Sequence, residues 1–310
     1  MPRVSIGLPV YNGENFLEAA LTSLLDQTFE DFELIISDNA STDKTEEVCR
    51  SFVAKDKRIR YFRNETNLGA SYNFNRVFEL SSAEYFKWAA HDDVCARTFL
   101  EKMVSMLDRD PSVVLCFSKT KFVNDAGQFL KDYSYNLRVN SAKPHQRFID
   151  LAIRDHIVVE IFGVIRADAL RRTPLIANYA GSDRVLLGEL ALSGRFFEVP
   201  EYLFLHREHS LRSTEVFPSL HSATQWFDPG RTGVIVFPTW RILLEHLASI
   251  RRSSLGLADR VICYLEMARW LRARRKRLTG DLRIGMKRLS FFENRRASNQ
   301  ISGENEVEHP

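Results

Sequence analysis

The chain has 310 residues, of which 45% are hydrophobic and 27% charged, a composition that supports a substantial buried core. No apolar run approaches the roughly 18 residues that a membrane-spanning helix needs, and the N-terminus lacks the layout of a signal peptide. Cys49, Cys95, Cys116 and Cys263 form no CxxC pair, which argues against a zinc cluster or a disulfide framework and fits a reducing compartment.

The net charge of +3 conceals an uneven distribution of charged residues. Residues 1–250 carry 29 Lys and Arg against 33 Asp and Glu, whereas residues 251–296 carry 14 against 4. The sequence thus predicts a mildly acidic folded body that is followed by a strongly basic segment.

Apolar runs alternate with helical patterns through the first part of the chain. The run at residues 4–10 ends in the turn-forming PVYNG, and the apolar residues from Phe16 to Leu25 then recur at helical spacing. The order of strand, polar loop and helix repeats before a further strand, which predicts a parallel, doubly wound α/β sheet. The predicted strands are residues 4–10, 32–37, 58–62, 85–89 and 113–117.

Polar residues gather in the loops after the first, second and fourth predicted strands, at residues 11–14, 38–43 and 91–93. In a parallel sheet these loops lie at one edge, where ligands bind. The first loop lacks GxGxxG and the chain has no P-loop sequence, so a conventional dinucleotide fold is disfavoured. A diphosphate at this edge would need Mg²⁺ or Mn²⁺ held by carboxylates such as those of HDD at 91–93. Taken locally, HDD also suits the N-terminus of the next helix.

The chain resembles the family 2 glycosyltransferases, which have the GT-A fold. The resemblance runs over residues 3–213, and the joint order and spacing of its segments make it specific, whereas no single motif does. It implies an α/β domain with a Rossmann-like, mostly parallel sheet flanked by helices. The matching segments are VSIGLPVYNGENFLEAALTSLLDQTFEDFELIISDNASTDKT, NETNLGASYNFN and KWAAHDD, with weaker matches at FGVIRADAL, GSDRVLLGELALSG and LHREHS.

This resemblance implies a site for a nucleotide sugar. Tyr11 would pack on the base and Asp38 would hydrogen-bond to it, with uracil as the usual base, while Asp92 would contact the ribose or the donor sugar. The residues implied on the donor side are Pro9, Tyr11, Glu14, Asp38, Asn75 and Asp92.

The resemblance also implies that Asp93 binds Mn²⁺ or Mg²⁺, that His209 lies near the ion or the diphosphate, and that Asp183 is the catalytic base. An inverting transferase needs such a base, because the acceptor hydroxyl loses its proton as it attacks the anomeric carbon. The implied reaction moves a sugar from a nucleoside diphosphate, with UDP as the expected nucleotide, to a glycan or lipid-linked acceptor in surface polysaccharide or glycolipid synthesis.

Each residue also has a plainer interpretation when it is taken alone. Asp183 suits the start of a helix, His209 a packed or surface histidine, and Tyr11 a turn. Two departures from the family pattern are His91 in place of a first Asp and Phe74 in place of an Arg on the third-loop helix. They leave open a catalytically inactive protein of the same fold that binds a nucleotide sugar or acts as a scaffold.

The sequence divides into three predicted parts. Residues 1–118 form the nucleotide-sugar-binding half, and residues 119–215 form the acceptor-binding half of the same domain, with a hairpin turn at NDAG, residues 124–127. Residues 216–310 form a helical, basic extension with a disordered end.

One predicted helix in the extension has an apolar row on one face and is followed by a dense cluster of Arg and Lys. Such a helix is typical of a membrane-surface element, so residues 251–296 predict attachment to an anionic membrane surface, in the cytoplasm at the inner face of the plasma membrane. A packed helix with a solvated basic face is the alternative. Nucleic acid is not expected as a partner, since no aromatic platform or known motif accompanies the charge. The apolar row is Leu257, Val261, Tyr264, Leu265, Ala268 and Leu271.

Overall fold

The computed structural model describes residues 1–228, 230 and 234–286, so the disordered end predicted for the extension lies outside the described residues. In the described part, nine strands form one sheet in the order β3-β2-β1-β4-β8-β6-β9-β5, with β7 paired to β6. The strands are β1 (Val4–Val10), β2 (Phe32–Asp38), β3 (Ile59–Arg63), β4 (Tyr85–Trp88), β5 (Val94–Cys95), β6 (Val113–Val123), β7 (Phe129–Tyr133), β8 (Val164–Arg166) and β9 (Arg195–Arg207).

The helices alternate with the strands and then continue into the extension. They are α1 (Leu17–Leu25), α2 (Thr45–Val53), α3 (Ala70–Glu79), α4 (Phe99–Arg109), α5 (Pro144–Phe148), α6 (Ala167–Arg171), α7 (Ser182–Ser193), α8 (Ser213–Val216), α9 (Leu220–Phe227), α10 (Pro238–Arg252) and α11 (Leu257–Ala273). A π-helical turn at Ile149–Ile153 and a 3₁₀ turn at Val159–Phe162 lie between α5 and β8.

The sheet has a parallel half and a mixed half. Strands β3, β2, β1 and β4 all run parallel, as the sequence predicts. Strand β8 is antiparallel to β4 and β6, while β9 runs parallel to β6 and antiparallel to the two-residue β5. The predicted α/β sheet flanked by helices is confirmed, and the antiparallel pairs of the second half are a feature that the periodicity did not reveal.

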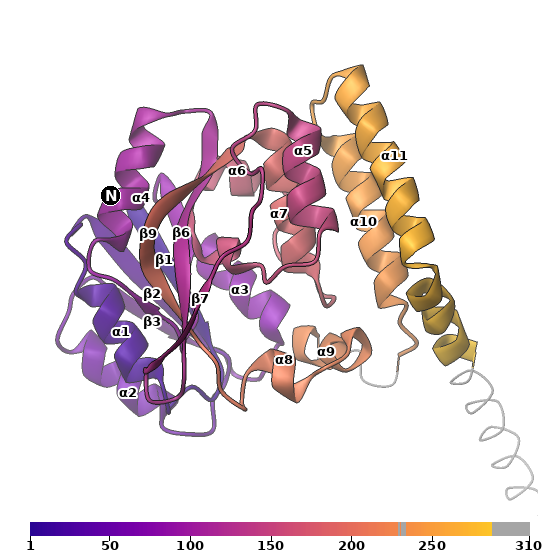
Figure 1. The fold of residues 1–310 in the computed structure, drawn as a ribbon. Coiled ribbons are helices and arrows are strands. Elements are labelled where there is room, and N and C mark those ends of the chain that lie inside the picture. The colour runs from indigo at the N-terminus through magenta and orange to yellow at the C-terminus, as the bar shows by residue number, and fades with distance from the viewer. Residues whose placement is uncertain (229, 231–233, 287–310) are drawn as a thin grey trace, which may run out of the picture.

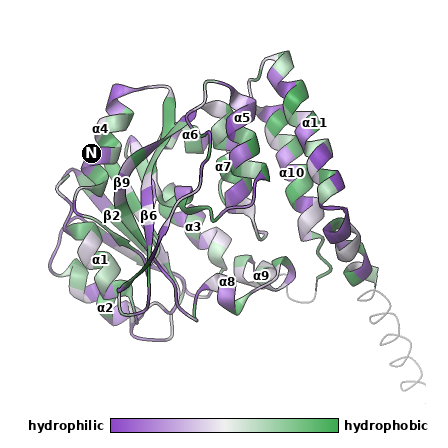
Figure 2. Ribbon diagram, viewed as in Figure 1, coloured by the Kyte–Doolittle hydropathy of each residue, from purple (hydrophilic) through white to green (hydrophobic). Residues whose placement is uncertain are grey.

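Helices cover both faces of the sheet (Figure 1). On one face, buried side chains of α1 and α4 pack with strand residues such as Ile6 and Leu34. On the other face, α3, α6 and α7 pack against residues that point the opposite way, such as Ile35 and Phe86. Every residue of β1 and β2 is buried, and Figure 2 shows the strands as largely hydrophobic, which is typical of parallel strands enclosed on both faces.

The helical extension packs against the body through α5 and α7 (Figure 1). Its core joins Phe148 of α5 and Ile250 of α10 to Cys263, Met267 and Trp270 of α11. The predicted helix is therefore confirmed, but the face that packs is not the predicted apolar row. Among the described residues, no helix combines the length and the hydropathy that crossing a bilayer requires.

Candidate functional site

Hydrogen bonds join the loop after β1 to the loop after β2. The Asn12 N–H donates to Ser41 Oγ, and Asn12 Oδ1 accepts from the Thr42 N–H, both at 2.9 Å. Asn12 has a φ of 52°, a left-handed conformation that asparagine adopts more readily than most residues. Glu14 accepts the Lys44 N–H at 2.9 Å, so its carboxylate holds the two loops together.

The two remaining first-loop residues differ in exposure. Pro9 is buried within β1, where it pairs with Ser37 of β2. Tyr11 follows the strand and is 42% exposed. Tyr11 thus offers an exposed ring to an aromatic ligand, whereas Pro9 does not.

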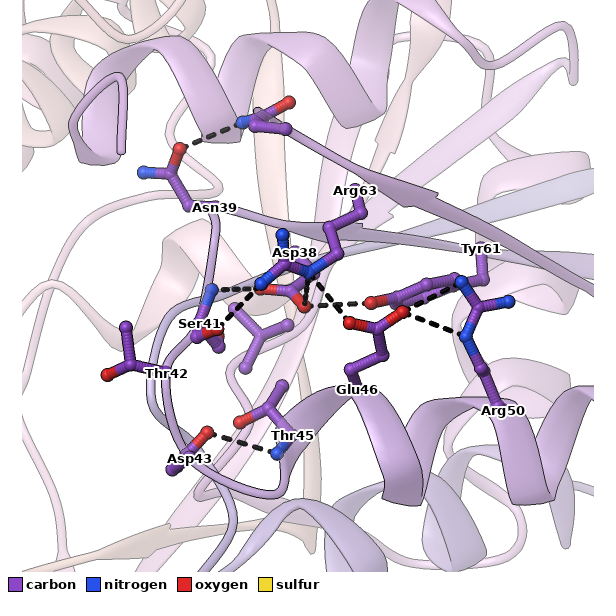
Figure 3. Close-up of polar contacts among 12 residues, drawn as sticks. Asp38, Asn39, Ser41, Thr42, Asp43, Thr45, Glu46, Arg50, Tyr61 and Arg63 are labelled. Atoms are coloured by element: carbon purple, nitrogen blue, oxygen red, sulfur yellow. Dashed lines mark hydrogen bonds and ion pairs between the residues drawn. The ribbon is translucent and has the colours of Figure 1, made fainter. Parts of the chain in front are cut away.

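Asp38 ends β2 as a fully buried carboxylate, shown in Figure 3. Its Oδ1 accepts from the Ser41 N–H at 2.8 Å, and its Oδ2 accepts from the Tyr61 hydroxyl at 2.7 Å. Arg63 lies 3.5 Å from the same Oδ2 and also pairs with Glu46 at 2.9 Å. Burial and the hydrogen bond to Asp38 raise the pKa of Tyr61, so the phenol remains a donor. Because the Asp38 side chain has no exposed surface, the predicted hydrogen bond to a base requires some of these contacts to rearrange, and it stays a prediction.

Asn75 of α3 is engaged with the segment that precedes α7. Its Nδ2 donates to the Ile176 carbonyl at 2.9 Å, and its Oδ1 accepts from the Ile176 N–H at 3.1 Å. The Ser71 hydroxyl donates to the same carbonyl at 2.8 Å. The neighbouring Phe74 packs against the core, with its ring 6.5 Å from that of Trp88. The role of Asn75 in donor binding stays a prediction, since its amide is occupied by protein contacts here.

The HDD segment does not begin a helix. It follows β4 and leads into β5, while α4 begins only at Phe99 with Thr98 before it. The interpretation of HDD as a helix N-terminus is therefore wrong. Its position at the carboxyl end of β4 is the one that the sheet pattern predicts.

The two carboxylates of this segment are held by residues at the end of β9 and just after it. Asp93 is 5% exposed, and its Oδ1 accepts from the Arg207 N–H at 2.9 Å and lies 3.1 Å from His206 Nδ1. Asp92 Oδ2 lies 2.9 Å from His209 Nε2. Asp93 and His209, which the resemblance places near one ion, thus each contact a different partner in this structure.

Imidazole groups lie close to the two adjacent carboxylates. Burial alone would raise the pKa of Asp92, but the His209 hydrogen bond and the charges of His91 and His209 lower it to about 2. Although burial lowers the pKa of His206, the charge and hydrogen bond of Asp93 raise it above its ordinary value. The two effects favour an ionised Asp92 and a protonated His206, so the repulsion between neighbouring carboxylates is offset locally.

The first loop also reaches the HDD segment. The Phe16 ring lies 4.6 Å from the His209 ring, and the Arg207 guanidinium lies 4.9 Å from the Phe16 ring centre. A Cβ on Gly13 would lie 2.7 Å from the His91 ring, so this close approach requires glycine. The loops after β1, β2 and β4 therefore form one continuous cluster with the end of β9, as the sequence predicts for the three loops.

Asp183 lies in the first turn of α7, which agrees with its plainer interpretation as a helix-start carboxylate. Gly181 before it has a φ of 88°, a conformation that favours glycine. Burial raises the pKa of Asp183, against the opposing effects of the Arg184 N–H, which donates to Oδ1 at 2.8 Å, and of the Arg184 charge. In the described part of the chain, no hydrogen bond or ion pair joins Asp183 to the carboxylates of the first, second and fourth loops.

Sequence reasoning missed His206 and Arg207. His206 contacts Asp93 directly, and Arg207 is 5% exposed and donates through Nε to the Asp92 carbonyl at 2.9 Å. The segment LHREHS drew attention to His209 alone, although two histidines three residues apart after an apolar strand were a visible signal. The contact itself depends on the β5–β9 pair, which is too short to predict from its sequence.

A curled α/β sheet flanked by helices, with its polar loops gathered at one edge, places the protein in the GT-A class of folds. The model of glycosyl transferase family 2 matches residues 5–172, more than half of the 310 residues, and the chain belongs to this family.

Sequence relatives agree with this assignment. An uncharacterized glycosyltransferase of Methanocaldococcus jannaschii is 31% identical over 134 residues, which are 43% of this chain and 46% of the relative. Another of Haemophilus influenzae is 25% identical over 222 residues, 70% of this chain and 68% of the relative. The chain therefore spans less than half of the length of some relatives that it matches.

Solved structures share the fold at low sequence identity. TarS residues 1–349 of S. aureus with UDP-GlcNAc has a TM-score of 0.66 and 16% identity, over 93% of this chain and 81% of that one. Mannosyltransferase PcManGT from Pyrobaculum calidifontis, solved with GDP-Man and Mn²⁺, has a TM-score of 0.51 and 16% identity, over 91% of this chain and 84% of that one. These likenesses are evidence of the fold alone.

Proposed function

We propose that the chain is an inverting glycosyltransferase that moves a sugar from a nucleoside diphosphate, with UDP as the nucleotide, to a hydroxyl of a glycan or lipid-linked acceptor. The observation that carries this proposal is the Asp92-Asp93 turn, held by His206, Arg207 and His209 beside the first loop. Two adjacent carboxylates, one buried and one half-buried, at the carboxyl end of a parallel strand suit a ligand with phosphate groups, if a cation lies between them and the phosphates.

The donor set of the turn fits a divalent ion that retains other oxygen ligands. Among the described residues, no three His, Cys, Asp or Glu side chains could hold a metal by themselves. Mg²⁺ and Mn²⁺ suit such a site because they accept water and phosphate oxygens in addition to one or two carboxylates. His209 Nδ1 is buried and has no hydrogen-bond partner in the described part, which leaves one nitrogen available. Asp93 and His209 would hold the ion, which when bound would stabilise charge on the leaving diphosphate.

The chain's own residues supply orientation and the proton acceptor. Tyr11 offers an exposed ring at the loop that Asn12 and Glu14 hold in place, which suits stacking on a base. Asp183 accepts the proton of the attacking hydroxyl, a role that its raised pKa favours at neutral pH. The fully buried Asp38 is held by Tyr61 and the Ser41 N–H, and it fixes the start of the loop after β2 beside which the base would lie.

A thermal-shift panel of UDP and GDP with and without Mn²⁺, followed by assay of nucleotide-sugar hydrolysis, tests this proposal. We expect UDP with Mn²⁺ to raise Tm most, and Asp93→Asn to remove the part that depends on Mn²⁺. Asp168→Asn, the same change on an exposed side chain of α6, is the matched control and should respond like the wild type. Binding of UDP without any hydrolysis or transfer would favour the inactive protein of the same fold instead.

The exposed face of α11 supports a second proposal, that the protein attaches to an anionic lipid surface. While Cys263, Met267 and Trp270 pack on the body, Leu257 is 79% exposed and Leu265 57% exposed on the other side of the helix. A hollow at the end of this helix is lined by four cationic side chains and Ala273. A dense positive cluster disfavours a second copy of the same chain and favours anionic headgroups, each cation contributing about 1 kcal/mol near such a surface. The cationic side chains are Arg269, Arg272, Arg275 and Lys276.

A further inference from the structure

A hollow lies beside the strands of the mixed half of the sheet, outside the cluster of nucleoside loops. The space in it that a water-sized group can occupy is about 20 Å³, enough for one such polar group. Its lining includes residues of β6, β9 and the segment between β7 and α5. The residues are Phe117, Ser118, Thr120, Tyr133, Tyr135, Leu137, Val139, Val159, Glu160 and Glu198.

Polar atoms in and beside this hollow are buried without partners. Thr120 is 1% exposed and Glu160 is 2% exposed, yet Thr120 Oγ1 and Glu160 Oε2 have no hydrogen-bond partner in the described part of the chain. The His156 side chain is fully buried, its Nε2 also has no partner there, and it lies 3.6 Å from Glu160 Oε2. Since nearly all buried polar groups in folded proteins are hydrogen-bonded, the unpartnered Thr120 oxygen and the long His156–Glu160 pair beside it indicate a site for a polar group from outside.

Contacts connect this cluster to Asp183. Arg184, the next residue in α7, donates through Nη1 to the Arg154 carbonyl at 2.8 Å and lies 3.2 Å from His156 Nδ1. The charge of His156 acts on Asp183 and lowers its pKa, in opposition to burial. The Tyr135 ring lies 5.5 Å from the His156 ring. The hollow and the proposed base are thus parts of one structural unit around the start of α7.

We propose that this hollow is a subsite for the acceptor, which receives one hydroxyl of an uncharged, polyhydroxylated molecule such as a pyranoside. The inference rests on the proposed glycosyl transfer and specifies where the acceptor binds. Glu160 accepts a hydrogen bond from the hydroxyl, and Thr120 can donate to the hydroxyl or accept from it. His156 Nε2 can likewise donate or accept, according to its tautomer. Glu160, with Glu198 exposed at the mouth, disfavours an anionic group such as phosphate.

Thr120→Val is the sharpest test, because valine keeps the volume of threonine while it removes an oxygen that has no partner in the free protein. If the hollow serves a ligand, this variant should keep or raise Tm, since the buried oxygen contributes no hydrogen bond to the fold. Glu160→Gln removes the charge with little change in shape. The matched control is Thr224→Val, another buried threonine, whose hydroxyl donates to the Leu220 carbonyl at 2.9 Å.

The measurement is saturation-transfer-difference NMR with methyl pyranosides of glucose, galactose and N-acetylglucosamine, in the presence of UDP and Mn²⁺. We expect a pyranoside to bind wild type and the Thr224→Val control alike, and to bind Thr120→Val and Glu160→Gln about tenfold more weakly. Equal binding by all four proteins, or no binding by the wild type, would overturn the proposal. A lowered Tm of Thr120→Val without pyranoside binding would identify a structural water instead.

The thermal shift with UDP tests the proposal for the donor site separately. A protein that binds UDP but no pyranoside refutes the acceptor subsite and leaves the donor proposal standing. A protein that binds pyranosides through Thr120 but gives no shift with any nucleotide refutes the donor proposal alone.

Discussion

Replacement of Asp183 by Asn separates catalysis from folding. The Asn Oδ1 can still accept the Arg184 N–H that Asp183 accepts at 2.8 Å, so the first turn of α7 keeps its local hydrogen bond. What the variant loses is the ability to take a proton. Since a positioned general base contributes about 10²- to 10⁴-fold, transfer should fall by this factor, which corresponds to about 3–5 kcal/mol of activation free energy.

The effect of this substitution on stability should have the opposite sign. Burial raises the pKa of Asp183 in the folded protein above its unfolded value, so the stability it contributes is fully present below the unfolded pKa and is lost as pH rises through the folded pKa. At neutral pH the ionised carboxylate therefore destabilises the fold relative to a neutral amide. The free energy of unfolding of Asp183→Asn should equal or exceed that of the wild type, and the difference should grow as pH rises.

Urea unfolding from about pH 4 to pH 8, together with transfer rates over the same range, measures both effects. In the wild type, the rate should fall at acidic pH with an apparent pKa above the ordinary value of about 3.9 for aspartate. Asp168→Asn in the first turn of α6 is again the matched control, and should change neither the rate nor its pH profile. Transfer at the wild-type rate by Asp183→Asn would refute the catalytic role. A large loss of stability would show that the carboxylate serves the helix start.

Three further predictions concern other parts of the molecule. His206→Gln should weaken the Mn²⁺-dependent response to UDP by about 10- to 100-fold in a titration, because His206 orients Asp93. Gly181→Ala should lower the free energy of unfolding by about 1 kcal/mol in urea, since its φ of 88° strains any residue with a Cβ. Val261→Gln combined with Leu265→Gln should abolish flotation with phosphatidylglycerol vesicles without loss of Tm, and unchanged flotation would refute attachment through α11.

The parallel half of the sheet follows from local patterns in the sequence. Short apolar runs separated by polar loops and helical spacing predict β1 to β4 in order, and their common direction brings the loops at 11–14, 38–43 and 91–93 to one edge. The predicted and observed strands agree closely because each strand is joined to the next by a helix, and neighbouring residues in the sequence encode both elements. The hairpin between β6 and β7 was likewise predictable from a local signal, the sequence NDAG at residues 124–127. Gly127 has a φ of 77° in that turn, a conformation that favours glycine.

Contacts between distant segments could not be predicted in this way. The partner of Asp93 is set by the two-residue β5–β9 ladder, which aligns Val94 with Leu205 and so brings His206 to the carboxylate. No periodicity marks so short a strand. The packed face of helix α11 was also not predictable from the sequence, because the helix carries apolar residues on two faces. The position of α5 and α10 determines which of these faces packs.

The adjacency of Asp92 and Asp93 also explains why the site is built from two segments. Two neighbouring carboxylates on one turn repel each other, and burial increases the cost of each charge. His206 at the end of β9 and His209 just after it supply a separate imidazole to each carboxylate, together with the backbone N–H of Arg207. The turn is thereby held in place before any ligand arrives, and a cation that binds there meets carboxylates that need little reorganisation.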